Sequence, residues 1–193
     1  MTQAKPIIVV SGLPRSGTSL MMKMLEAAGL ELLVDNKRKA DQDNPKGYYE
    51  LEAVAQMKDK GTNWVAEAPG KAVKVVAPLL KYLPAEYAYK VLFMRRAMPE
   101  ILASQKQMLT RRGKDAEAVP DAAMAQIFDK QLAEVLKWMS ENGSTEYIEI
   151  PFSELVAGNM QILESILKFL DLEMDMNAMA QIADPELYRQ RVN

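Results

Sequence analysis

Residues 12–19 (GLPRSGTS) combine two glycines, one basic residue and three hydroxyl side chains in a short segment. Four residues separate Gly12 from Gly17, as in phosphate-binding loops, whose backbone N–H groups and following helix N-terminus bind anions. Nucleoside triphosphatases carry a lysine directly after the second glycine, but Thr18 stands at that position here. Arg15 instead supplies a cation from within the loop. The segment therefore predicts an anion site that does not depend on the usual lysine.

The elements that would position this loop are a strand before it and a helix after it. Residues 6–10 (PIIVV) are a short β-branched run, which is typical of a buried strand. Residues 18–28 have apolar side chains at helical spacing, and Gly29 suits the position just after a helix. The predicted apolar face consists of Leu20, Met21, Met24, Leu25 and Ala28. The loop thus lies at a helix N-terminus, where anion binding requires it.

A second group with suitable chemistry is the pair Arg96 and Ser104. The predicted strand 88–94 ends just before Arg96, and Pro99 suits the first turn of a helix that ends near Gly113. Ser104 falls within that helix. A planar guanidinium with several donors, together with a hydroxyl, suits a phosphate monoester at the carboxyl edge of a parallel sheet.

These two groups carry a family resemblance. Residues 14–19 (PRSGTS) resemble the 5′-phosphosulfate loop of sulfotransferases that use 3′-phosphoadenosine 5′-phosphosulfate (PAPS), which reads Pro-Lys/Arg-Ser-Gly-Thr-Thr/Ser. That family binds the 3′-phosphate with an arginine at a strand end and a serine eight positions on, which is the separation of Arg96 and Ser104. Residues 147–156 (YIEIPFSELV) are similar to the family's late strand and the helix start after it, which serve packing. The resemblance spans about residues 7–170.

The resemblance implies a set of roles in sulfuryl transfer from PAPS. Arg15 would neutralise the charge that develops on the bridging oxygen. The backbone N–H groups of Ser16, Gly17 and Thr18 would hold the 5′-phosphate, and the Thr18 and Ser19 hydroxyls would add donors. Pro14 belongs to the same motif, Arg96 and Ser104 would bind the 3′-phosphate, and no metal is required.

The 3′-phosphate site is incomplete in the sequence, because the family's C-terminal Arg-Lys-Gly clamp is missing. Arg111, Arg112, Arg189 and Arg191 are candidates to complete it. For each of them, a solvated arginine at a helix end is the more common case.

A general base must come from a carboxylate if the protein is an enzyme. The chain has no His and no Cys, which excludes Ser-His triads, thiolate nucleophiles and His- or Cys-ligated zinc. Golgi and tyrosine-directed sulfotransferases use a Glu beyond the loop helix, and the resemblance therefore makes Asp35 and Glu50 the candidates. Asp41 and Asp43 are the next candidates, and all four are also compatible with exposed loop carboxylates.

The acceptor is not encoded in any motif, but several residues would surround it. Residues 35–47 (DNKRKADQDNPKG) are charged and almost without apolar side chains, which is compatible with a surface loop or a substrate loop. Lys71 and Lys74 would guide the donor sulfate or an acidic acceptor. Tyr48, Tyr49 and Trp64 would form a wall of the acceptor pocket.

The rest of the chain alternates strands and helices, which predicts an α/β fold of three layers with a mostly parallel sheet. Further strands are expected at 72–76 and 146–150, with a short helical connection between 77 and 84. Helices are expected at 121–140 and from Ser153 to about 170, with a mixed segment at 48–57 and a helical tail after Met174. The resemblance implies a single sulfotransferase-like domain, 1–193, with a P-loop-like fold.

Composition narrows the function classes. The chain has 193 residues, of which 49% are hydrophobic, and a formal net charge of -2, which argues against a surface built for nucleic acid. No apolar run of about 18 residues is present and the first residues lack a secretory signal, so we expect a cytoplasmic protein without membrane insertion.

Two other functions stay open alongside the sulfotransferase. One is a non-catalytic protein that binds PAPS or its product, 3′-phosphoadenosine 5′-phosphate (PAP). The other is a nucleotide kinase or hydrolase that uses the same loop with Mg²⁺, against which Thr18 at the lysine position argues.

Overall fold

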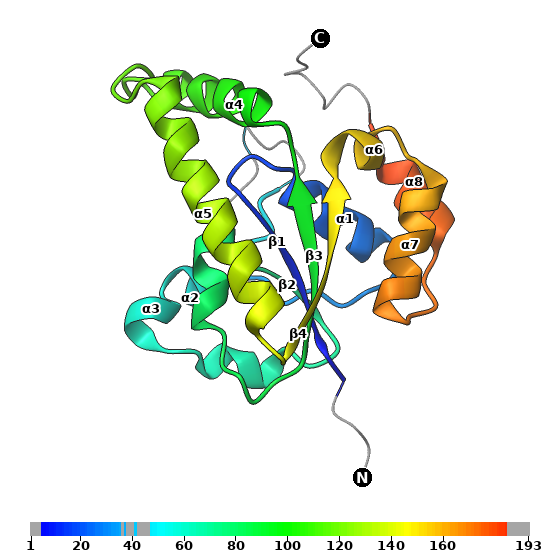
Figure 1. The fold of residues 1–193 in the computed structure, drawn as a ribbon. Helices are drawn as coiled ribbons and strands as arrows, with labels where there is room; N and C mark the ends of the chain where they lie inside the picture. The colour runs from blue at the N-terminus through cyan, green and yellow to red at the C-terminus, as the bar shows by residue number, and fades with distance from the viewer. Residues whose placement is uncertain (1–4, 36, 38–40, 42–46, 185–193) are drawn as a thin grey trace.

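A computed structural model describes residues 5–35, 37, 41 and 47–184. In this part of the chain four parallel strands form one sheet, in the order β2-β1-β3-β4 (Figure 1). The strands are β1 (Ile7–Gly12), β2 (Ala72–Lys74), β3 (Tyr89–Arg95) and β4 (Thr145–Pro151). The α/β class and the parallel sheet predicted from the sequence are therefore confirmed.

Helices cover both faces of the sheet and make three layers (Figure 1). One face packs against α1 (Thr18–Ala27), α6 (Phe152–Val156), α7 (Met160–Leu170) and α8 (Met176–Ile182). The other face packs against α2 (Glu52–Ala55), α3 (Met57–Lys60), α4 (Met98–Arg111), α5 (Asp121–Glu141) and two 3-10 helices, η1 (Asn63–Glu67) and η2 (Ala77–Tyr82). Apolar burial on both faces of the sheet fixes the strands that carry the site.

The central strand β1 explains where the site must lie. Every residue of β1 is buried, and it pairs with β2 on one side and β3 on the other. Because all three run parallel, their carboxyl ends meet at one edge of the sheet. The loop after β1, the end of β2 at Lys74 and the end of β3 at Arg95 therefore converge there.

The helix predicted from Ser153 to about 170 is two helices, so that expectation was wrong. Gly158 has φ 69°, a left-handed conformation that ends α6, and Asn159 starts α7 by accepting a hydrogen bond from the Gln161 N–H at 2.9 Å. The apolar spacing continues across this break, which is why periodicity alone did not reveal it. The strand predicted at 72–76 is shorter, since β2 ends at Lys74.

Other boundaries agree closely with the sequence. Helix α1 starts at Thr18, and Gly29 follows it with φ 91°. Pro99 is in the first turn of α4, which ends at Arg111. Within the described residues, no helix is both long and apolar enough to cross a bilayer.

Candidate functional site

The loop between β1 and α1 has the tight backbone that its glycines permit. Gly12 has φ 150° and Gly17 has φ 99°. A Cβ on Gly12 would lie 2.4 Å from the Ser16 Oγ, and a Cβ on Gly17 would lie 2.3 Å from the Phe152 ring. Arg15 adopts φ 68°, which is uncommon for a residue with a side chain. The loop geometry is thus specified by glycines at two positions and held by packing.

The loop leads into the N-terminus of α1, a kind of position where proteins often bind anions. Gly17 caps α1, and among the described residues no side chain caps this helix N-terminus and no acidic residue lies in its first turn. The Ser16 side chain is fully buried, and its Oγ has no hydrogen-bond partner in the described part of the protein. A helix N-terminus with uncapped N–H groups and a buried hydroxyl fits a phosphate or sulfate.

Arg15 and Ser104 are brought together although they lie 89 positions apart. The Arg15 Nε donates to the Ser104 Oγ at 3.0 Å, and Ser104 is 6% exposed within α4. The parallel topology causes this contact, because α4 starts at the end of β3 next to the loop that follows β1. The hydroxyl predicted to bind the 3′-phosphate therefore touches the loop cation.

Arg96 is held on three sides. Its Nε donates to the Glu100 carboxylate at 3.0 Å, and its Nη1 donates to the Arg15 carbonyl at 3.0 Å. The guanidinium carbon lies 4.5 Å from the centre of the Phe152 ring. Arg96 therefore links the start of α4 to the loop and to α6, and lies where the sequence predicted a phosphate-binding cation.

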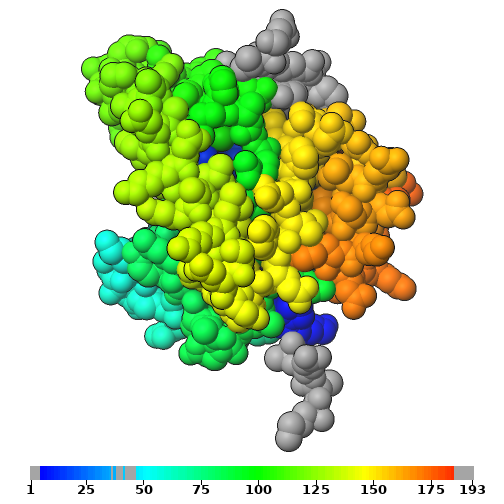
Figure 2. All heavy atoms as spheres, viewed as in Figure 1, coloured from blue at the N-terminus to red at the C-terminus, as the bar shows by residue number. Residues whose placement is uncertain are grey.

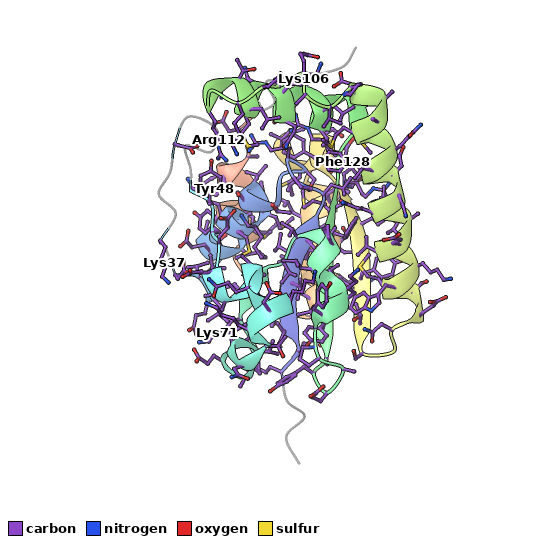
Figure 3. All side chains as sticks on the ribbon, turned by 90° about the vertical axis from the view of Figure 1, so that its left-hand side faces the viewer. Lys37, Tyr48, Lys71, Lys106, Arg112 and Phe128 are labelled. Atoms are coloured by element: carbon purple, nitrogen blue, oxygen red, sulfur yellow. The ribbon has the colours of Figure 1, made fainter. Side chains whose placement is uncertain are left out.

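Lys74 connects the end of β2 to the loop helix. Its side chain is only 5% exposed. Its Nζ lies 3.4 Å from the Ser19 Oγ and 3.4 Å from the Glu50 Oε1, and it also donates to the Tyr48 carbonyl. A buried ammonium beside the anion loop and a carboxylate is an arrangement that can bind a second anionic group. Lys71, by contrast, forms an ion pair with the exposed Glu31 at 2.7 Å and lies away from Tyr48 (Figure 3).

The two predicted bases lie in different surroundings. The Asp35 carboxylate accepts hydrogen bonds from the backbone N–H groups of Glu52 at 2.7 Å and Lys37 at 3.1 Å. The hydrogen bond from the Glu52 N–H is the main cause that lowers the pKa of Asp35. Glu50 instead faces Lys74 and has a side chain that is 39% exposed. Asp35 therefore holds the start of α2, and Glu50 is the candidate that we favour as the base, since it lies beside Lys74 and the loop helix.

Two of the remaining candidates, Asp41 and Arg112, lie beside Tyr48 at the end of α4. The Tyr48 hydroxyl contacts both carboxylate oxygens of Asp41 at 2.7 Å, and the Arg112 Nη2 donates to that hydroxyl at 3.3 Å. Figure 3 shows Tyr48 directly below Arg112. Arg111 is exposed at the end of α4. Asp43, Arg189 and Arg191 lie outside the described residues.

The three aromatic residues expected to line an acceptor pocket lie in different parts of the structure. Tyr49 turns to α1, where its hydroxyl donates to Glu26 at 3.0 Å, and burial raises its pKa to about 12. Trp64 is buried in the core cluster on the α4–α5 face. Only Tyr48 contacts a group of the loop, since the Ser19 Oγ donates to its carbonyl at 3.4 Å.

A cavity of about 220 Å³ adjoins the loop on the α5 side of the sheet. It opens between α5 and the end of β3 in Figure 2. Leu13, Met98 and Ile101 contribute apolar lining, and Arg96 and Asp129 contribute charges. Glu50 and Lys74 do not line it, so it is separate from the carboxylate favoured as the base.

Sequence reasoning missed Glu100 and gave Phe152 only a packing role. Glu100 is 3% exposed, and its sole indication in the sequence is its position four residues after Arg96 in a predicted helix. Phe152 does pack, against Gly17, but it also lies under Arg96. Both contacts depend on the fold rather than on local sequence.

Comparison with known proteins gives likeness in structure alone. A scan against protein-family models finds no match, and a search of curated proteins finds none. A sulfotransferase domain from the curacin biosynthetic pathway matches with a TM-score of 0.58 and 17% identity, over 94% of this chain and 78% of that domain. A sulfotransferase domain from the Synechococcus PCC 7002 olefin synthase matches with a TM-score of 0.57 and 17% identity, over 100% of this chain and 86% of that one.

These likenesses show that the chain has the fold of sulfotransferase domains, a parallel α/β sheet flanked by helices. At this level of identity the activity does not follow from the fold, and it must be argued from the site.

Proposed function

We propose that this protein is a PAPS-dependent sulfotransferase that moves a sulfuryl group to a hydroxyl or amine acceptor. The observation that carries the proposal is the convergence on Arg15. Ser104 accepts a hydrogen bond from its side chain, and Arg96 donates one to its backbone carbonyl. A 5′-phosphosulfate loop and a 3′-phosphate pair must be adjacent to bind one bisphosphorylated nucleotide, and these contacts join them.

The donor would be held mainly by the loop. Backbone N–H groups of Gly17 and Thr18 would bind the 5′-phosphate at the uncapped N-terminus of α1, with the Ser19 hydroxyl beside them. The Ser16 N–H donates to the Leu13 carbonyl at 3.2 Å in this structure and would have to leave it to join them. Pro14 precedes Arg15 in this turn. Arg96 and the Ser104 hydroxyl would bind the 3′-phosphate, which makes Ser104 a shared partner of Arg15 and that phosphate.

The transfer step needs a base and a stabilised leaving oxygen. Glu50 would accept the proton of the acceptor hydroxyl while the oxygen of that hydroxyl forms a bond to sulfur. The bond between sulfur and the bridging oxygen breaks, and its electron pair remains on the 5′-phosphate of PAP. Arg15 would neutralise that charge, and Lys74, beside Ser19 and Glu50, would contact the sulfuryl oxygens.

The two alternative functions predict different ligands and products. A Mg²⁺-dependent kinase or hydrolase would prefer ATP, yet the loop cation is Arg15 and Thr18 occupies the lysine position. A non-catalytic binder would hold PAP without producing it.

The test is a turnover assay with the purified protein, PAPS and a pool of small phenols, alcohols and amines, in the presence of EDTA. We expect PAP to accumulate only when a suitable acceptor is present. Cleavage of ATP that requires Mg²⁺, with no reaction of PAPS under any condition, would contradict the proposal.

A further inference from the structure

Glu100 forms a buried ion pair with the guanidinium proposed to bind the 3′-phosphate. The Glu100 side chain is 4% exposed and the Arg96 side chain is 7% exposed, with 3.0 Å between Oε2 and Nε. Glu100 lies in the first turn of α4, and Arg96 lies four residues earlier, just before the helix begins.

A carboxylate so deeply buried needs its cation. Removing one partner of a buried pair leaves an uncompensated charge, which is strongly destabilising. The pair therefore fixes the guanidinium plane, which also stacks on Phe152 and donates to the Arg15 carbonyl. Glu100 is linked to the loop through Arg96, which donates to both the Glu100 carboxylate and the Arg15 carbonyl.

The pair also limits how Arg96 can meet a phosphate. A guanidinium binds an oxyanion best through two parallel N–H groups, and the edge that contains Nε is the one directed at Glu100. An arriving 3′-phosphate must then use the other N–H groups and lies close to a second negative charge. The carboxylate and the phosphate compete for one cation.

We infer that Glu100 is the positioning residue that sets how strongly this site discriminates nucleotides by their 3′-phosphate, by orienting Arg96 and partly neutralising it. This inference rests on the proposed function. Its consequence is a moderated affinity for the bisphosphate product, because part of the charge of Arg96 is already compensated inside the protein.

The test compares affinities for PAP and adenosine 5′-monophosphate, which differ only in the 3′-phosphate, in the wild type and in Glu100→Gln. Gln keeps the size and an oxygen that accepts from the Arg96 Nε, but it removes the charge. We expect the affinity ratio of PAP to monophosphate to rise about tenfold, since a charge several Å from the phosphate is lost. The variant without ligand should melt at a lower temperature, and PAP should raise that temperature by more than in the wild type.

Glu134→Gln is the matched control, because Glu134 on α5 is 61% exposed and its loss changes the net charge equally. It should leave the ratio unchanged. Glu100→Asp keeps the negative charge but moves it away from Arg96, and should raise the ratio two- to threefold. This second variant keeps the inference testable if Glu100→Gln folds poorly. An unchanged or lower ratio in a folded Glu100 variant overturns the inference. Equal binding of both nucleotides by the wild type would instead overturn the proposed 3′-phosphate site.

Discussion

The two sides of the candidate site, which we call the donor side and the acceptor side after their proposed roles, differ in how deeply their side chains are buried. On the donor side, the Ser16, Ser104 and Glu100 side chains are buried, and every contact is anchored in a helix or the loop after β1. On the acceptor side, Glu50 and Asp41 are 39% and 45% exposed, and the buried Lys74 links Glu50 to the end of β2. A rigid donor site beside a more exposed acceptor side suits an enzyme with one fixed donor and a variable second substrate.

The largest effect on activity is expected when the positive charge of Arg15 is removed from the loop. Arg15→Ala should reduce sulfuryl transfer roughly a thousandfold, because no other loop side chain neutralises the leaving oxygen. It should weaken PAP binding much less. Steady-state rates and calorimetry on the same preparation measure both quantities. Arg15→Lys is the control, because it keeps a positive charge at this position, where the backbone φ is 68°. It should retain most of the activity. An equal loss of activity in both variants would contradict a role for the charge.

The acceptor side is tested by a pair of carboxylate variants. Glu50→Gln should lower kcat about a hundredfold, since the acceptor hydroxyl loses its proton acceptor, while PAP affinity stays the same. Asp35→Asn is the matched control and should leave kcat within about a factor of three, because Asp35 binds the N–H groups of Glu52 and Lys37. The reverse order of effects would identify Asp35 as the base.

Arg96→Lys tests how the donor side recognises the 3′-phosphate. Lys keeps the positive charge beside Glu100 but has no planar fork of donors, so the preference for PAP over adenosine 5′-monophosphate should fall about tenfold. Arg96→Ala is less informative, since it leaves the Glu100 carboxylate buried and unpaired. Calorimetric titration with both nucleotides gives the ratio, and an unchanged value would show that Arg96 does not bind the 3′-phosphate.

The smallest expected effect concerns stability. Asp35→Asn should cost about 1 kcal/mol of the free energy of unfolding at pH 7, because solvent at this exposed carboxylate reduces the ~1.5–3 kcal/mol of a hydrogen bond to a charged group. The folded-state pKa of Asp35 lies below its unfolded value of 3.8. Its stabilisation is therefore complete above about pH 5 and is lost as the pH falls through the lowered folded value. Urea unfolding of both proteins between pH 7 and pH 3 should show a constant difference in stability down to about pH 5, which then shrinks as the pH falls toward 3.

The sequence predicted the strand, loop and helix around residues 7–27 because the information for them is local. A β-branched strand, two glycines and an amphipathic helix specify the loop without help from the rest of the chain. The eight-residue separation of Arg96 and Ser104 is likewise contained in one strand end and one helix. The alternation of strands and helices along the chain predicted the parallel sheet.

What the sequence could not predict are contacts made by topology. The Arg15–Ser104 bond joins residues 89 positions apart, and Lys74 meets Glu50 across 24 positions because β2 ends beside the loop. Glu100 resembles any acidic residue in a first helical turn until its burial is known. The break at Gly158 is a single-residue conformation within an unbroken apolar pattern.

The central claim is tested most directly by calorimetric titration of the wild-type protein with PAP, with ADP and with ATP plus Mg²⁺. We expect PAP to bind at least tenfold more tightly than ADP or ATP, with the same affinity in EDTA, because Arg96 and Ser104 lie next to the anion loop. Absence of PAP binding, or a preference for ATP that requires Mg²⁺, would contradict the assignment of this loop to a PAPS-type donor.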